Sequence, residues 1–275
     1  MGIVLFGYDV ERQNEGGSEE TRLFLRVAPE LHRELQAPCT FFVCGRTLEG
    51  NLDHLKRVKD EYGDLIDFGQ HTYSHVLLKT VCQVNEQGTT VFRGGTLEQI
   101  EEEVARTNGL LERHLGVECR ALTGPYGYYR GLCDRPDLLE IVHRHGIRIL
   151  RTYARNEHDW QPVAMTVQPF WYQAQGYGDV LECPVQGWQD CILRDNIGWA
   201  NHQSYMEAVR PQLAQVAEQD LVWGYAQHDW SSVREDPEMS LTRSVLECAL
   251  GLGLSFESYY QFHERQRRLL APSGV

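Results

Sequence analysis

The stretch LIDFGQHTYSH, residues 65–75, joins a short apolar run to two histidines that stand four residues apart. The run from Leu65 to Gly69 has the composition of a buried strand, and it delivers His71 at its end. Two imidazoles at this spacing can bind one metal ion from the same side. The stretch therefore predicts a strand whose carboxyl end carries two metal ligands.

Apolar runs alternate with charged, helical stretches along the rest of the chain. Strands are expected at 3–8, 39–44, 65–69, 119–122, 147–151, 180–184, 221–226 and 254–256, and helices at 18–35, 54–61, 96–115, 138–145, 205–219 and 241–250. This alternation is typical of an α/β fold with a parallel sheet. The number of strands predicts a distorted (β/α) barrel of about seven or eight strands.

The 275-residue chain contains no Pro/Ser-rich linker, low-complexity tract or internal repeat. We therefore expect a single domain that spans residues 1–275. A polar segment at 76–95, which contains Gly88 and Gly94-Gly95, interrupts the alternation. This segment is interpreted as an insertion that forms an extra hairpin.

The composition limits the partners of the protein. A net charge of −13 argues against nucleic acid and an anionic membrane surface as partners, since both would be repelled, and it favours a neutral or cationic substrate. No apolar run approaches the roughly 20 residues that span a bilayer, and the N-terminus lacks the features of a signal peptide, so a cytoplasmic location is expected. The eight cysteines form no C-x-x-C pair and are interpreted as reduced thiols. Whether the protein is an oligomer is left open.

Polar side chains follow four of the expected strands. They are Asp9-Val10-Glu11, His71, Gly124-Pro125-Tyr126-Gly127 and His228-Asp229-Trp230. In β/α barrels the chemistry lies at this carboxyl face. Two neutral imidazole nitrogens and one carboxylate form a three-ligand catalytic site with an open position for water. We therefore expect His71, His75 and a carboxylate of the 9–11 segment to bind one divalent metal ion.

In their order along the chain, these motifs resemble those of the polysaccharide deacetylase family, the NodB-type carbohydrate esterases. The matching motifs are His71-Thr72-Tyr73-Ser74-His75, Pro125-Tyr126-Gly127, Asp159-Trp160 and Gln227-His228-Asp229. The ordered set of motifs runs from the first strand to His228, and it indicates the family more specifically than any single motif does. The resemblance implies a NodB homology domain and a metal-dependent deacetylase of N-acetylated sugars.

The first motif departs from the adjacent aspartates that are usual in this family. Asp9 and Glu11 are separated by Val10, and side chains two apart on a strand point to the same face. The resemblance assigns Asp9 as the general base and Glu11 as the third metal ligand beside the two histidines, although the two roles could be exchanged. Zinc is the expected ion, with cobalt, nickel or manganese as alternatives.

The remaining motifs supply the other roles that the resemblance implies. His228 would be the general acid, and Asp159 would keep its imidazole protonated. The N–H of Tyr126 would stabilise the oxyanion, while Pro125 would stiffen the turn. Trp160 would line the substrate pocket together with Tyr126.

The third motif lacks its usual arginine, which pairs with the base in this family, and has Thr123 at that position. Arg130, which is also expected to bind substrate, is the first candidate to replace it, and Arg151 is the second.

These observations predict a hydrolase of non-peptide carbon–nitrogen bonds, specifically an N-deacetylase of an amino sugar or polysaccharide. One alternative keeps the site but changes the substrate to a small linear or cyclic amide, as for a deformylase or amidohydrolase. A second alternative, motivated by the missing arginine, is a catalytically weak, carbohydrate-binding pseudoenzyme.

Overall fold

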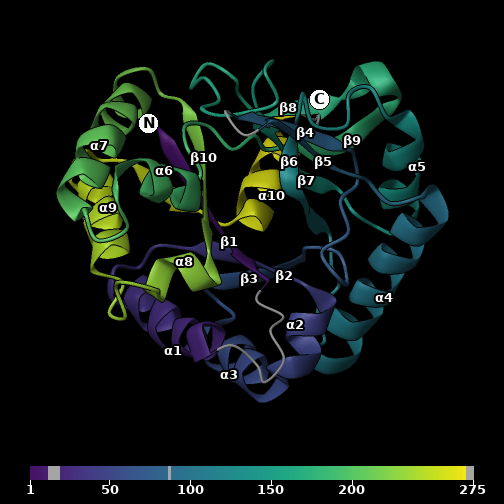
Figure 1. Ribbon diagram of the computed structural model, residues 1–275. Coiled ribbons are helices and arrows are strands. Elements are labelled where there is room, and N and C mark those ends of the chain that lie inside the picture. Colours follow the sequence, from purple (N-terminus) through teal and green to yellow (C-terminus); the bar gives the residue numbers. More distant parts are fainter. Residues whose placement is uncertain (12–18, 86–87, 271–275) are drawn as a thin grey trace, which may run out of the picture.

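The computed structural model describes residues 1–11, 19–85 and 88–270 (Figure 1). Its main sheet has the strand order β10-β1-β2-β3-β6-β7-β9-β8, and β11 also pairs with β1. The pairs are parallel, except for the antiparallel pair of β8 and β9. The strands are β1 (Ile3–Val10), β2 (Cys39–Val43), β3 (Ile66–Gln70), β6 (Ala121–Tyr129), β7 (Ile149–Arg155), β8 (Phe170–Tyr172), β9 (Tyr177–Glu182), β10 (Val222–His228) and β11 (Ser255–Glu257). The expected α/β fold is confirmed.

The gap between β7 and β10 is spanned by the segment that follows β9. The backbone N–H of Val185 donates to the carbonyl of Tyr153 in β7, at 2.8 Å. The next N–H, that of Gln186, donates to the carbonyl of Gly224 in β10, at 3.1 Å. The sheet therefore bends round into a distorted barrel, in which an irregular segment takes the place of regular strand pairing.

Helices surround the sheet (Figure 1). They are α1 (Glu19–Glu34), α2 (Gly45–Gly50), α3 (Leu52–Tyr62), α4 (Leu97–Leu115), α5 (Pro136–Arg144), α6 (Asp190–Ile197), α7 (His202–Glu218), α8 (Asp229–Val233), α9 (Ser240–Gly251) and α10 (Tyr259–Leu270), with a 3₁₀ turn η1 (Gln173–Gln175). The Thr96 side chain caps the start of α4 by accepting a hydrogen bond from the N–H of Gln99. Gly116, in the left-handed conformation, ends the helix. Among the described residues, no helix has the length and apolar character needed to cross a membrane.

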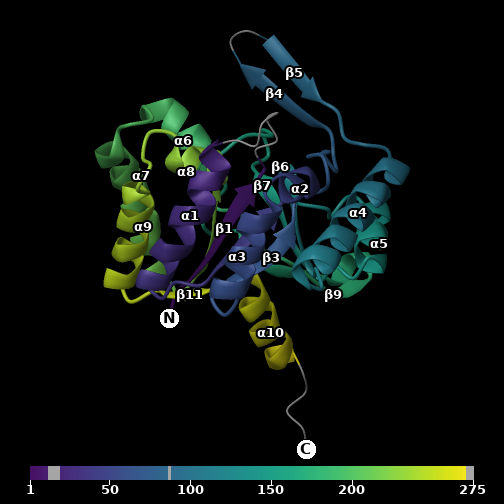
Figure 2. The same cartoon turned by 90° about the horizontal axis from the view of Figure 1, so that it is seen from below.

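Two features lie at opposite ends of the barrel (Figure 2). At one end, β4 (Val81–Asn85) and β5 (Gly88–Phe92) form a separate antiparallel hairpin that projects from the body of the molecule. At the other end, α10 places Tyr259 and Phe262 in an apolar cluster with Leu5 and Phe42. The hairpin lies within residues 76–95, and the division of the chain into one domain with an insertion there stays a prediction.

Each strand that the sequence predicted is present, with boundaries shifted by a few residues, and β6 is longer because it continues to Tyr129. The helices α2, α6, α8 and α10 were not expected. The first three have at most eight residues, too few for a helical period to stand out.

Candidate metal and catalytic site

A cavity of about 220 Å³ lies at the carboxyl ends of β1, β3, β6, β7 and β10. Because the strands are parallel, their carboxyl ends lie at the same end of the barrel, so segments far apart in sequence meet there. The predicted residues that line the cavity include Asp9, Glu11, His71, His75, Tyr126 and His228.

Glu11 and the two histidines converge on one point. Glu11 Oε2 lies 2.9 Å from His75 Nε2 and 3.2 Å from His71 Nε2. The three candidate ligand atoms all lie within 4.8 Å of one another. His71 Nδ1 is 3.0 Å from the carbonyl oxygen of Thr123, to which it donates, so Nε2 keeps its lone pair free for a metal.

The ionisation of Glu11 matches the role of a metal ligand. Burial opposes its charge, but the charge of His228 and the hydrogen bonds of His71 and His75 outweigh burial and hold the pKa of Glu11 well below its usual value. The second oxygen, Oε1, accepts from Trp230 Nε1 at 2.9 Å, which fixes the carboxylate plane. One carboxylate oxygen and two imidazole nitrogens, each oriented by a hydrogen bond or a neighbouring ring, are a donor set that fits zinc.

Asp9 is paired with Arg151 inside the barrel. Arg151 Nη2 donates to Asp9 Oδ1, and Arg151 Nε donates to Thr123 Oγ1 at 3.0 Å. Thr123 and Arg151 are direct partners across β6 and β7, so the threonine that occupies the place of the expected arginine supports an arginine from the next strand. The arginine that the sequence ranked second is therefore the one that reaches Asp9.

Arg130 does not lie in this cavity. It is exposed and lines a separate hollow with Tyr129, Cys133 and Asp134. The reason is the left-handed turn after β6, where Arg130 has a φ of 57° and the chain leaves the barrel end. The prediction that Arg130 replaces the missing arginine and binds substrate is wrong for this geometry.

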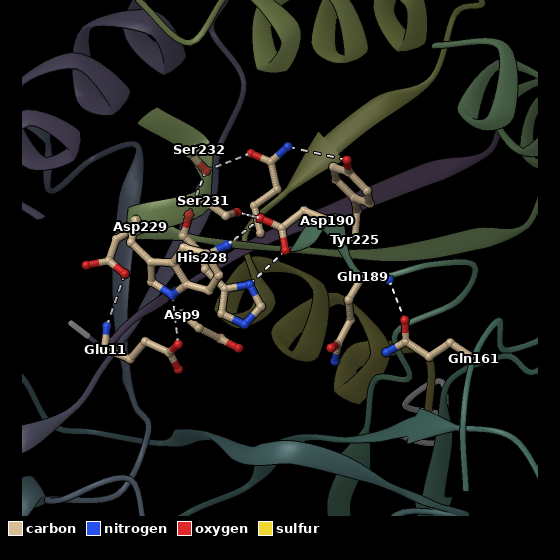
Figure 3. A network of polar contacts seen from close by, with 12 residues as sticks. Asp9, Glu11, Gln161, Gln189, Asp190, Tyr225, His228, Asp229, Ser231 and Ser232 are labelled. Atoms are coloured by element: carbon tan, nitrogen blue, oxygen red, sulfur yellow. Dashed lines mark hydrogen bonds and ion pairs between the residues drawn. The ribbon is translucent and has the colours of Figure 1, made fainter. Parts of the chain in front are cut away.

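His228 is held by Asp190 and not by Asp159. His228 Nδ1 donates to Asp190 Oδ1 at 2.7 Å, and the backbone N–H of His228 donates to Asp190 Oδ2 at 2.9 Å (Figure 3). Burial would lower the pKa of His228, but the charge of Asp190, with smaller contributions from Cys191 and Glu11, raises it well above the usual value. This shift favours the protonated imidazole, and the partner that the sequence assigned to it, Asp159, is wrong.

Asp159 instead fixes the loop after β7. Its Oδ2 accepts from the backbone N–H of Cys82 at 2.7 Å, and its Oδ1 lies 3.9 Å from Arg155 Nε. Asp159 thus connects this loop to the projecting hairpin, with a left-handed φ of 55°. The neighbouring Trp160 lines the cavity and is 36% exposed, which is compatible with its expected contact to substrate.

The loop at Tyr126 is a bulge in β6. Pairing with β7 shifts register between Thr123 and Tyr128, and Tyr126 and Gly127 have left-handed φ angles of 66° and 63°. Arg155 Nε donates to the carbonyls of both residues at 3.1 Å, which holds the bulge in place. The Tyr126 ring lines the cavity, whereas Pro125 is buried and contributes no lining surface there.

Asp190 and Trp230 are the residues of this site that the sequence analysis missed. Asp190 begins α6, whereas β9 already ends at Glu182, so the strand-end argument that identified the other polar clusters does not extend to Asp190. Trp230 was quoted only as a neighbour of His228, and no sequence signal gave its indole a partner.

Comparison with protein families matches residues 25–150 to the polysaccharide deacetylase family. The matched family is the one that the sequence motifs resemble. None of the curated proteins that were compared with the chain matches it. Among solved structures, a Mycobacterium smegmatis protein described provisionally as a polysaccharide deacetylase superposes with a TM-score of 0.71 at 18% identity, covering 99% of this chain and 93% of that chain.

Two further solved structures share the fold of this chain. The polysaccharide deacetylase Bc1974 from Bacillus cereus has a TM-score of 0.50 and 16% identity, covering 94% of this chain and 92% of that one. A mutant of BA3943, a CE4 family pseudoenzyme with restored enzymatic activity, has a TM-score of 0.54 and 13% identity, covering 95% of this chain and 67% of that one. At these identities the likeness shows the fold alone.

Proposed function

We propose that the protein is a metal-dependent hydrolase of non-peptide carbon–nitrogen bonds that removes the acetyl group from an N-acetylated amino sugar. One observation carries the proposal. The Glu11–His71–His75 triad, the Asp9–Arg151 pair and the His228–Asp190 pair open onto a single cavity. Metal ligands, a base and an acid are the groups that hydrolysis of an amide needs.

The triad is the proposed metal site. A divalent ion held by Glu11, His71 and His75 would lower the pKa of a water molecule and polarise the amide carbonyl. Zinc is the preferred ion for this donor set, with cobalt, nickel or manganese as alternatives. Trp230 and the carbonyl of Thr123 orient two of the three ligands, which supports a site built for an ion.

Asp9 is the proposed base. Arg151 holds its Oδ1, which leaves Oδ2 directed toward the triad, 3.9 Å from His71 Nε2. A water molecule attacking an amide carbonyl at the triad would lose its proton to this oxygen. Arg151 orients the carboxylate and compensates its charge inside the barrel.

His228 is the proposed acid, and it lines the same cavity beside Asp9, its partner across β1 and β10. Asp190 binds Nδ1, so Nε2 is the nitrogen that would donate a proton to the departing amine. The backbone N–H of Tyr126, in the β6 bulge, is the proposed donor to the oxyanion. Both groups act as the family resemblance implies, with Asp190 in the place assigned to Asp159.

The cavity also suggests the substrate class. Tyr126, Trp160 and Trp230 bring aromatic rings to its wall, and such rings bind the apolar faces of sugars. The Asp9–Arg151 pair speaks against the pseudoenzyme alternative, because that alternative was motivated by the absence of an arginine beside the base. A neutral sugar is not repelled by a chain with a net charge of −13. A small amide substrate and a cytoplasmic location stay predictions.

A product analysis tests this proposal. Zinc-loaded protein is incubated with N-acetylglucosamine oligomers, N-formylated sugars and small linear and cyclic amides, and acetate, formate and ammonia are measured. We expect acetate from the N-acetylated sugars, and a loss of about 10² or more in Asp9→Asn, which removes the base and keeps the triad. Formate or ammonia as the main product would favour the amidohydrolase alternative, and no product from any substrate would favour the pseudoenzyme.

A further inference from the structure

A second group of metal-binding atoms lies beside the first. Asp190 and Cys191 begin α6, and His228 ends β10. A carboxylate oxygen, the Cys191 sulfur and a ring nitrogen of His228 lie within 4.8 Å of one another. None of these three residues belongs to the Glu11–His71–His75 triad, so the two groups could hold separate ions.

The His228 ring is already oriented as a metal ligand would be. Asp190 is fully buried, and both of its oxygens accept hydrogen bonds: Oδ1 from His228 Nδ1, and Oδ2 from the His228 N–H and from Ser231 Oγ. A histidine that binds a metal through one nitrogen almost always gives its other N–H to a carboxylate or carbonyl. The hydrogen bond to Asp190 therefore leaves Nε2 as the nitrogen available to a ligand.

Cys191 supplies the soft ligand. Its side chain is partly exposed and lines the same cavity as His228, so an ion in the cavity can reach the sulfur. Thiolate and imidazole together select zinc and similar soft ions over magnesium and calcium. The remaining positions around such an ion would be open to water, as in other sites that face a cavity.

The same three residue types also occur as a nucleophilic cysteine with its base and orienting acid. Here burial raises the pKa of the Cys191 thiol, and the charge of His228 offsets burial only in part. A nucleophilic cysteine needs a lowered pKa. The metal-binding interpretation does not, because a bound ion displaces the thiol proton itself.

We propose that Cys191 and His228, with Asp190 orienting the imidazole, form a second binding site for zinc in the same cavity. Binding forms bonds from the ion to Sγ and Nε2 and releases the protons of these atoms to water. While the ion is bound, Nε2 cannot donate a proton. Excess zinc therefore inhibits the enzyme, a consequence that rests on the proposed function, whereas the site itself does not.

Cobalt binding tests the site without any assay of turnover. Cobalt coordinated by a thiolate absorbs in the near ultraviolet through charge transfer from sulfur, and cobalt at the triad, which has only nitrogen and oxygen ligands, does not. We expect this absorption in wild-type protein with excess cobalt, and also in His75→Ala, which weakens the triad. Cys191→Ser should abolish it. Cys82→Ser, the matched control, removes an exposed thiol on the hairpin and should retain it.

A second variant, Asp190→Asn, tests the site if Cys191→Ser does not fold. Asp190→Asn keeps both proposed ligands but loses the carboxylate that orients His228, so the absorption should persist with cobalt affinity lowered by about 10- to 100-fold. Absence of the thiolate absorption from wild type at saturating cobalt would overturn the proposal, as would its persistence in folded Cys191→Ser.

A separate experiment tests inhibition of the enzyme by excess zinc. The ratio of acetate release with and without excess zinc should fall in wild type and in Cys82→Ser, and should fall less in Cys191→Ser. If no variant releases acetate while the cobalt absorption depends on Cys191, the proposed function fails and the second site stands.

Discussion

Arg151 of β7 reaches the proposed base, Asp9 of β1, across the inside of the barrel, and it affects both stability and catalysis. Arg151 is 2% exposed, and its guanidinium lies over the Phe42 ring at 4.5 Å, so its charge depends on Asp9 for compensation. Removing one partner of a buried ion pair leaves the other charge uncompensated. The pair therefore links the stability of the barrel to the orientation of the base.

The first prediction concerns this pair. Arg151→Met should lower the free energy of unfolding by about 3 kcal/mol, because the charge of Asp9 loses its partner. It should also lower turnover while metal content is unchanged. The matched control is Arg130→Ala, an exposed arginine outside the cavity, which should change stability by less than about 0.5 kcal/mol. Urea denaturation, metal analysis and acetate release measure the three quantities. Equal effects of the two variants would contradict the account.

The second prediction concerns pH. Only protonated His228 can donate to the leaving amine, so turnover should fall as pH rises through its pKa, which lies well above 6.5. Asp190 is the largest cause that raises this pKa. Asp190→Asn should therefore move the alkaline limb of the kcat profile to lower pH. A limb that stays in place would mean that another group supplies the proton.

Sequence reasoning worked at the residue scale where a strand carries the side chain. Asp9 lies near the end of β1, Glu11 and His71 follow strand ends directly, and strand alternation placed both acids on one face. It failed for Asp159 because the dipeptide Asp159-Trp160 lies on an irregular loop, where neither period nor spacing shows which acid reaches β10. Only the three-dimensional path of the loop brings Asp190 there instead.

At the scale of elements, α1 docks on β1 through a buried histidine. His32 Nδ1 donates to the Ala37 carbonyl at 2.6 Å, and Tyr8 donates to His32 Nε2 at 2.8 Å. This arrangement needs the neutral ring, because a protonated Nε2 could not accept from Tyr8. Burial lowers the pKa of His32 from 6.5 to about 4, with partial opposition from the hydrogen bond to Ala37.

The third prediction follows from that shift. The folded state binds the proton less tightly than the unfolded state, so the stability from neutral His32 is complete above pH 6.5 and is lost as pH falls toward 4. The loss should approach about 3 kcal/mol. His32→Gln should be less stable than wild type at neutral pH but lose less stability on acidification. Urea denaturation at several pH values measures both slopes, and parallel slopes would refute the assignment.

The apolar runs that form strands and the helices with apolar positions four apart were predicted correctly. The helices that were missed are three short ones and α10. The helix α6, which carries Asp190 and Cys191, has eight residues. A helix of about two turns has too few residues for a periodic apolar face, so the element that holds the acid could not be predicted from its pattern.

At the scale of the whole molecule, α10 closes the end of the barrel opposite the site (Figure 2). Phe262 is 1% exposed in the cluster with Leu5 and Phe42, while Leu269 on the same helix is 71% exposed. Nothing in the sequence distinguished these two residues, because the barrel end that Phe262 fills forms only when distant strands have met.

The fourth prediction uses this contrast. Phe262→Ala should lower the free energy of unfolding by about 3–5 kcal/mol, since it opens a cavity in the barrel. The control, Leu269→Ala, should lie within about 0.5 kcal/mol of wild type. Denaturant unfolding of both variants gives the comparison. Similar values for the two would mean that α10 does not close the barrel.

The central claim is that Glu11, His71 and His75 hold the ion on which hydrolysis depends. The most direct measurement is acetate release by metal-free protein during titration with zinc. The account predicts no activity without metal, a maximum near one equivalent, and no response in His71→Ala or in Glu11→Gln. Acetate release that needs no metal, or full recovery by zinc in His71→Ala, would contradict it.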